Sequence, residues 1–116
     1  MDFNSNIPIY LQIVDEFKRK IVTKEYVPSQ KVESVRELAL TLGVNPNTVQ
    51  KALAELERQG IVYTNRTTGR YISDNSELIT TERIAYINIK VNEFICEMKK
   101  MGFDKEQIIE IMKGEN

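Results

Sequence analysis

The chain has 116 residues, 41% of them hydrophobic and 28% charged, and its net charge at pH 7 is −1. This mixture excludes a disordered chain, and no apolar run approaches the length of a membrane span. A single cysteine, Cys96, and the lack of histidine exclude an intrachain disulfide and a zinc site. We therefore expect no cofactor and no metal.

Two further exclusions concern location and partners. The N-terminus has neither a basic region nor a continuous apolar core, so it is not a signal peptide and we expect a cytoplasmic protein. Residues 1–76 contain ten Lys or Arg and nine Asp or Glu, and residues 77–116 contain six and eight. Any contact with nucleic acid must therefore come from a local basic face rather than a charged tail.

An amphipathic helix is predicted to open the folded chain. Asn6 is its expected N-cap and Val27-Pro28 its expected end, because the residue before proline disfavours helix. The apolar residues that recur at helical spacing are Tyr10, Val14, Phe17 and Ile21. We expect this face to pack on the segment that follows.

The stretch 33–60 predicts two short helices joined by a tight turn. Ser34 and Glu37 have the spacing of a capping box for the first helix, and Gly43 suits the turn. Asn45 is a good N-cap for the second helix, and Pro46 falls at its first position. Its buried stripe comprises Val49, Ala52, Leu53 and Leu56. This pattern is typical of a helix-turn-helix.

The second helix is the candidate recognition helix, because its polar side chains face outward. Asn47, Gln50 and Lys51 are residue types that read base edges or hold phosphates in a major groove. Asn47 and Thr48 lie in its first turn, where free backbone N–H groups suit a phosphate. An ordinary helical hairpin with a solvated polar face remains the alternative from these residues alone.

A two-stranded hairpin is predicted directly after this helix. Residues 61–63 and 71–73 are β-rich, and residues 64–70 between them contain Asn, Arg and Gly. A hairpin in this place is a wing, and Arg66 and Arg70 near its tip are placed to follow or enter a minor groove. The alternative is a plain hairpin that covers the core.

These motifs, in this order, resemble the winged helix-turn-helix of GntR-family transcriptional regulators. The resemblance rests on Pro8-Ile9-Tyr10, SVRELA (34–39), LGVNPNTV (42–49), residues 56–62 and Gly69-Arg70-Tyr71-Ile72. The resemblance implies a transcriptional repressor that acts as a homodimer on a palindromic operator in double-stranded DNA. The motifs and the resemblance together predict twelve DNA-binding residues: Ser34, Arg36, Asn45, Pro46, Asn47, Thr48, Gln50, Lys51, Arg66, Thr68, Gly69 and Arg70.

The sequence departs from the family pattern at three places. Ser29 stands where a glycine usually follows the loop proline, and Glu33 adds a negative charge beside the predicted phosphate contact. Thr67 replaces the first glycine of the wing, which makes a positive φ at the tip less accessible. None of these changes alters the class.

The remaining segment, residues 77–116, predicts a long helix from about Glu77, a break at Gly102 and a last helix capped by Asp104. The residues at spacings of three and four along the long helix are Ile84, Ile87, Val91, Phe94, Met98 and Met101. We predict a dimer interface on this seam, with packing inside one chain as the alternative. Two helices are too few to enclose a roomy ligand cavity, although a small-molecule effector stays open.

The sequence thus predicts a mainly α protein with a small β-wing. It has a winged helix-turn-helix DNA-binding domain at 1–76 and a two-helix dimerisation or regulatory tail at 77–116, which resembles the YtrA-like branch of the family. That branch suggests transporter genes as targets. A protein–protein adaptor is the second function class, because winged helices also serve as interaction modules. An enzyme is the weakest class, because no catalytic motif is present.

Overall fold

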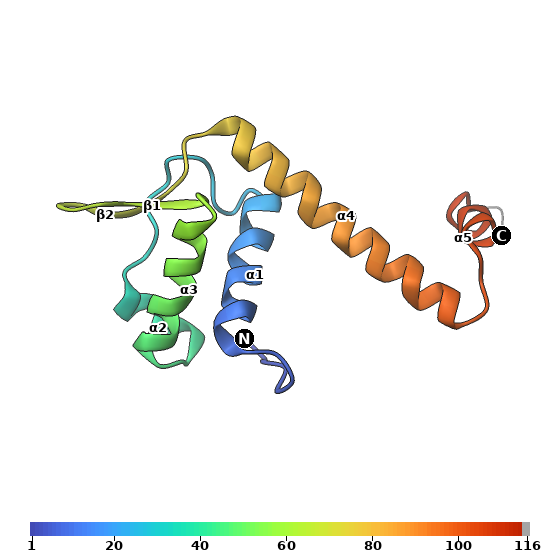
Figure 1. Ribbon diagram of the computed structural model, residues 1–116, viewed down its shortest axis with the longest axis horizontal. Coiled ribbons are helices and arrows are strands. Elements are labelled where there is room, and N and C mark those ends of the chain that lie inside the picture. The colour runs from blue at the N-terminus through green and yellow to red at the C-terminus, as the bar shows by residue number, and fades with distance from the viewer. Residues whose placement is uncertain (115–116) are drawn as a thin grey trace. The chain divides into compact units, whose positions relative to one another are not determined.

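The computed structural model describes residues 1–114, which form two compact units, Met1–Arg83 and the residues from Ile84 onward (Figure 1). Its elements are α1 (Ile9–Val22), α2 (Val35–Leu42), α3 (Pro46–Arg58), β1 (Val62–Asn65), β2 (Gly69–Ile72), α4 (Ser76–Lys100) and α5 (Lys105–Met112). The predicted fold class, mainly α with a small β-wing, is confirmed. None of the helices in the described part is long and apolar enough to cross a membrane.

Helix α1 begins and ends differently from the prediction. Pro8 takes the N-cap position with no side-chain cap, so Asn6 is not the cap. The helix ends at Val22 because Lys24 adopts a left-handed φ of 64° and the chain folds back. This turn brings Tyr26 into the core, where its ring stacks on Phe17 with 5.2 Å between centroids.

Helices α2 and α3 form with the predicted caps. Ser34 and Glu37 make the reciprocal capping box at the start of α2, and Asn45 accepts a hydrogen bond from the Asn47 N–H at the start of α3. Gly43 ends α2 at φ 70°, a left-handed conformation that a side chain would strain. The tight turn therefore sets α3 against α2.

The core of the first unit is organised on the apolar stripe of α3. Its members are completely buried, and the residues are Val49, Ala52, Leu53 and Leu56. The buried face of α1 packs on this stripe, as the periodicity predicts. Burying a large aliphatic side chain contributes about 1.5–3 kcal/mol, so this stripe fixes which face of α3 stays outside.

The wing is a two-stranded antiparallel hairpin with Val62 opposite Ile72 and Asn65 opposite Gly69. Both Val62 and Ile72 are buried, which ties the base of the hairpin to the core. The segment before α2 adds to it, because Lys31 forms a bridge with Tyr71 and the Val32 N–H donates to the Arg70 carbonyl at 2.9 Å. The wing therefore leaves the domain in a defined direction.

The first turns of α4 belong to the first unit. Ile79 is buried in its core, and the Arg83 guanidinium donates to the Val22 carbonyl at 3.4 Å. Lys18 lies 3.9 Å from Glu82. The rest of α4, together with α5, forms the second unit. Our functional division after residue 76 stays a prediction.

The second unit has little interior of its own. Asp104 caps α5 in a capping box with Gln107, as predicted, and Gly102 breaks the chain between the two helices. Among the described residues of this unit only Ile108 is buried. A segment with one buried residue cannot be stabilised by its own core.

Ser29, at the place of the usual family glycine, has a left-handed φ of 68°, and its N–H donates to the Ile72 carbonyl at 3.0 Å. Because a Cβ is strained there, Ser29→Gly should raise the free energy of unfolding by up to about 1 kcal/mol, measured by urea denaturation. Ser5→Gly, at an exposed residue without positive φ, is the control and should not stabilise. If Ser29→Gly and Ser5→Gly lower the free energy of unfolding equally, the backbone at Ser29 is not strained.

Tyr26 makes the fold sensitive to high pH. Burial, followed by the hydrogen bond from its hydroxyl to Glu33 at 2.5 Å, raises the pKa of Tyr26 far above its ordinary value. The folded state thus favours the neutral phenol. The resulting stability is complete below the unfolded-state pKa of about 10 and is lost as the pH rises above it.

Tyr26→Phe should therefore lower stability at pH 7 by about 1–3 kcal/mol, because a hydrogen bond to a carboxylate is removed. Between pH 9 and 11 the variant should lose less stability than the parent. Tyr63→Phe, at an exposed tyrosine, should keep the parental pH dependence. The same slope in the parent and Tyr26→Phe, by urea denaturation across this range, would contradict the assignment.

Candidate nucleic-acid interface

The N-terminus of α2 presents two of the predicted contacts. The Ser34 hydroxyl accepts from the Glu37 N–H at 3.1 Å, and its own proton is left to donate outward. Arg36 lies in the first turn of α2 and is exposed. The capping box therefore fixes the backbone from which Arg36 projects.

The N-terminus of α3 presents the next group. The Asn45 side chain accepts from the Asn47 N–H at 2.7 Å, so this amide oxygen is committed to the cap. Pro46 occupies the first helical position, Asn47 is exposed and Thr48 is half-buried. The positive end of the helix dipole and the exposed Asn47 amide together suit a phosphate or a base edge.

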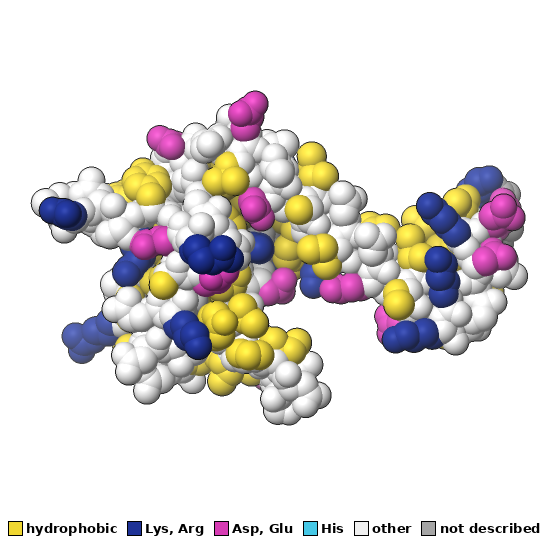
Figure 2. All heavy atoms as spheres, viewed as in Figure 1, with side chains coloured by type: hydrophobic (Ala, Val, Ile, Leu, Met, Phe, Trp, Pro, Cys, Tyr) yellow, Lys and Arg dark blue, Asp and Glu magenta, His cyan; other side chains and the backbone are white. Residues whose placement is uncertain are grey.

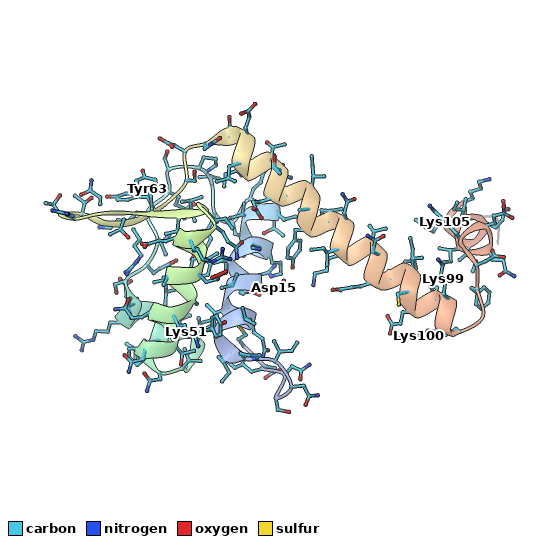
Figure 3. The ribbon with its side chains drawn as sticks, viewed as in Figure 1. Asp15, Lys51, Tyr63, Lys99, Lys100 and Lys105 are labelled. Carbon is cyan, nitrogen blue, oxygen red and sulfur yellow. The ribbon has the colours of Figure 1, made fainter. Side chains whose placement is uncertain are left out.

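The exposed face of α3 continues with Gln50 and Lys51. The Lys51 ammonium lies 4.3 Å from the centre of the Tyr10 ring, which holds the side chain over α1 (Figure 3). Gln50 is exposed one turn from the N-terminus. Figure 2 shows Lys and Arg side chains at the end of the hairpin and over α2 and α3.

The wing turn forms without the usual first glycine. The Asn65 carboxamide oxygen accepts from both the N–H and the hydroxyl of Thr67, at 3.0 and 2.9 Å. Thr67 has no positive φ, which Gly69 alone adopts in this turn, at 117°. Thr67 therefore does not need the positive φ that the family glycine permits, because the Asn65 side chain organises the turn. Arg66 and Thr68 are exposed in this turn.

Arg70 lies in β2 rather than in the turn, and its side chain returns to α3. Its guanidinium donates to the Gln50 carboxamide oxygen at 3.2 Å, and its Nε lies 3.4 Å from a Glu57 carboxylate oxygen. The side chain is only 28% exposed. A direct contact of Arg70 with DNA stays a prediction, while its contact with α3 is observed.

Four predicted contacts meet at one cleft. A cleft of about 490 Å³ lies between the segment before α2 and the wing, and its lining includes Ser34, Thr68, Gly69 and Arg70. Lys31 also lines it, and sequence reasoning missed this residue. The only feature of the sequence that could have indicated Lys31 is its positive charge three residues before the N-cap Ser34. Arg36 and the face of α3 do not line this cleft.

Glu33 has a structural partner. Its carboxylate accepts the hydrogen bond from the hydroxyl of the buried Tyr26. The negative charge of Glu33 beside the predicted phosphate contact therefore has a structural role. Among residues 1–114 no group of acidic or sulfur side chains is arranged to hold a metal ion.

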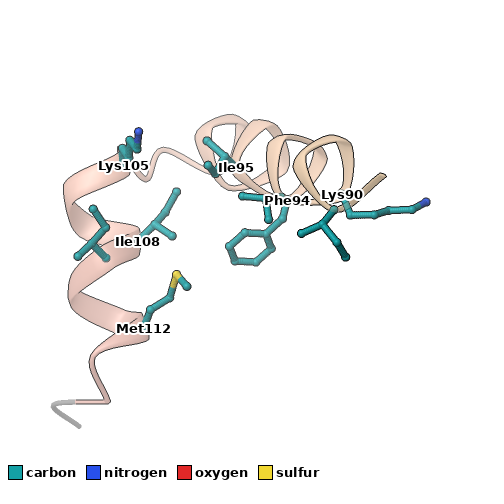
Figure 4. A pocket seen from close by; sticks show the side chains of 9 residues that line it. Lys90, Phe94, Ile95, Lys105, Ile108 and Met112 are labelled. Atoms are coloured by element: carbon teal, nitrogen blue, oxygen red, sulfur yellow. The ribbon is translucent and has the colours of Figure 1, made fainter. Parts of the chain in front are cut away.

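The predicted seam of the second unit is largely exposed. The Val91 and Phe94 side chains are 48% and 44% exposed, and Ile84, Ile87 and Met101 are more than 45% exposed as well, with Met98 half-buried. A groove of about 310 Å³ runs between α4 and α5, lined by apolar side chains that include Ile95, Ile108 and Met112 (Figure 4). An apolar surface of this kind is typical of an interaction site.

Comparison with known proteins agrees with this geometry. Residues 9–72 match the model of the bacterial regulatory proteins of the gntR family. The HTH-type transcriptional repressor YtrA of Bacillus subtilis is 38% identical over 97% of this chain and 88% of its own length.

Two solved structures extend the comparison. A GntR family transcriptional regulator from Listeria monocytogenes is 42% identical, with a TM-score of 0.87 over 98% of this chain and all of that one. The AraR DNA-binding domain in complex with an operator is 29% identical, with a TM-score of 0.56 over 63% of this chain and 86% of that one.

The family match covers the helices and the wing that carry the exposed polar surface, and the Listeria structure also covers the two C-terminal helices. The chain therefore belongs to the GntR family, as a DNA-binding winged helix-turn-helix transcriptional regulator with a short, YtrA-like tail.

Proposed function

We propose that the protein is a homodimeric repressor that binds a palindromic operator with one winged helix-turn-helix from each subunit. The single observation that carries the proposal is the burial of one face of α3, which leaves Asn47, Gln50 and Lys51 exposed on the other. A helix held in this way presents its polar face to a major groove.

Three further features support DNA as the partner. Arg36 on α2 and Arg66 in the wing turn are exposed on elements that flank α3. Such residues grip phosphates or guanine and set the register of the helix in the groove. The operator complex of AraR provides a precedent, because that domain shares the fold over 63% of this chain. An adaptor surface would not require basic residues at these places.

The second unit supports the dimer. Its apolar side chains are about half exposed in the single chain. Full burial of such a side chain contributes about 1.5–3 kcal/mol, so covering the exposed half of several of them stabilises a dimer. A second copy offers the same apolar seam and can form a symmetric interface. Linking two weak DNA-binding domains raises apparent affinity by about 100-fold or more, which explains why a palindrome is needed.

The proposal includes two finer points, of which the first follows from the resemblance to YtrA-like regulators. We include transporter genes among the proposed targets, and a cytoplasmic location where the operator is accessible. The groove between α4 and α5 is also a place where a small apolar effector would compete with the dimer contacts.

Arg36→Ala should weaken binding to duplexes selected from a randomised pool by about 5- to 150-fold, because a bidentate guanidinium contact contributes about 1–3 kcal/mol. Thermal unfolding should not change. Arg58→Ala is the matched control, because the Arg58 guanidinium is already paired with the Glu55 carboxylate. Its hydrogen bond lowers the pKa of Glu55 to about 2. Parental affinity in Arg36→Ala at equal salt, by fluorescence anisotropy, would refute the assignment.

The dimer is tested by replacing Val91 and Phe94 together with Asp. Burying unpaired carboxylates costs several kcal/mol, so the double variant should sediment as a monomer in analytical ultracentrifugation and bind a full palindrome poorly. Asn88→Asp with Asn92→Asp adds the same charge at exposed positions about 60° and 100° around the helix from Val91, and this variant should stay dimeric. A dimeric Val91→Asp/Phe94→Asp variant would place the interface elsewhere.

A further inference from the structure

The wing and the recognition helix are joined by a small polar network. Arg70 on β2 pairs with Thr64 on β1 in the strand register, and both side chains reach α3. The Thr64 hydroxyl donates to the Glu57 carboxylate, and the Arg70 Nε lies 3.4 Å from the same carboxylate. The Glu57 carboxylate therefore attracts the Arg70 guanidinium to the surface of α3 as an ion pair, although the buried Nε itself makes no hydrogen bond.

The other end of this guanidinium holds Gln50. Gln50 and Glu57 are seven residues apart, two turns of the helix, so they lie on the same face of α3. The Arg70 Nη2 donates to the Gln50 Oε1 at 3.2 Å. A guanidinium has donors and no acceptor, so the carboxamide must turn its oxygen towards Arg70 and its NH₂ group away.

The orientation of this carboxamide matters for base recognition. A free glutamine presents both an acceptor and a donor, the pair that matches the N6 and N7 atoms of adenine. When its oxygen is held by an arginine, the NH₂ donor is what remains for the groove. Guanine offers two acceptors there, O6 and N7, and suits this donor better than adenine does.

We propose that Arg70 is a positioning residue that orients Gln50 as a hydrogen-bond donor and so sets a preference for guanine over adenine at the base pair Gln50 reads. The proposal rests on the DNA-binding function of α3 and is the alternative to the prediction that Arg70 itself contacts DNA. Its charge is offset by Glu57 and its side chain is mostly covered, unlike that of Arg66.

The experiment uses the full chain and duplexes selected by it from a randomised pool. The base pair that Gln50 reads is the one whose substitution loses its effect in Gln50→Ala. The parent should bind the guanine duplex about fivefold or more better than the duplex with adenine at that place. In Arg70→Ala this ratio should fall towards one, while the slope of log K against log salt stays parental.

Three variants make the test specific. Arg66→Ala, in the exposed wing turn, should show the opposite result: a slope reduced by about one phosphate contact and an unchanged base preference. Arg70→Lys keeps a donor but lacks the fork, so it should restore part of the preference. Arg70→Ala in the Gln50→Ala background should change the base preference no further. Thermal unfolding of each variant confirms that the domain is folded.

An adenine preference in the parent would overturn the proposal, as would an unchanged base preference in Arg70→Ala. A salt slope reduced by one in Arg70→Ala would also overturn it, because that result identifies a phosphate contact. If Gln50→Ala alters no base preference while the parent still selects a duplex, the inference fails and the DNA-binding function stands. Failure of the parent to select any duplex would instead refute the proposed function.

Discussion

The burial of one stripe of α3 is the constraint on which the proposed DNA-binding surface depends. Leu53 and Leu56 are fully covered by the neighbouring helices, and neither can turn outward without opening a large cavity. Cavities of that size cost about 2–5 kcal/mol, a large fraction of the stability of a small domain. The helix is therefore locked in rotation, and the outward direction of Asn47 and Gln50 follows from its apolar residues.

The wing depends on the same helix in a second way. The base of the hairpin is anchored by buried Val62 and Ile72, while its middle is joined to α3 through Glu57 and Arg70. One element thus contributes both the polar face and the platform that directs the wing. Arg66 at the turn and Gln50 on the helix are consequently positioned by one set of contacts, which favours a single rigid surface for DNA.

The sequence predicted the helices around the turn well because each boundary carried its own local signal. Ser34 with Glu37 and Asn45 with Pro46 are caps whose chemistry acts within three residues. The end of α1 was predicted too late because its cause is distant: the chain folds back so that Tyr26 can stack on Phe17 and bind Glu33. The contact of Arg70 with Gln50, twenty residues away, likewise has no local signal.

We propose that α3, flanked by the start of α2 and the wing turn, is the surface that contacts DNA. An NMR titration of the isotope-labelled protein with a selected duplex tests it most directly, because backbone amides report contact residue by residue. We expect the largest chemical-shift changes at residues 34–37, 45–51 and 65–69, and small changes on the outward face of α1 around Asp15. Shifts concentrated on that face of α1, with residues 45–51 unchanged, would contradict it.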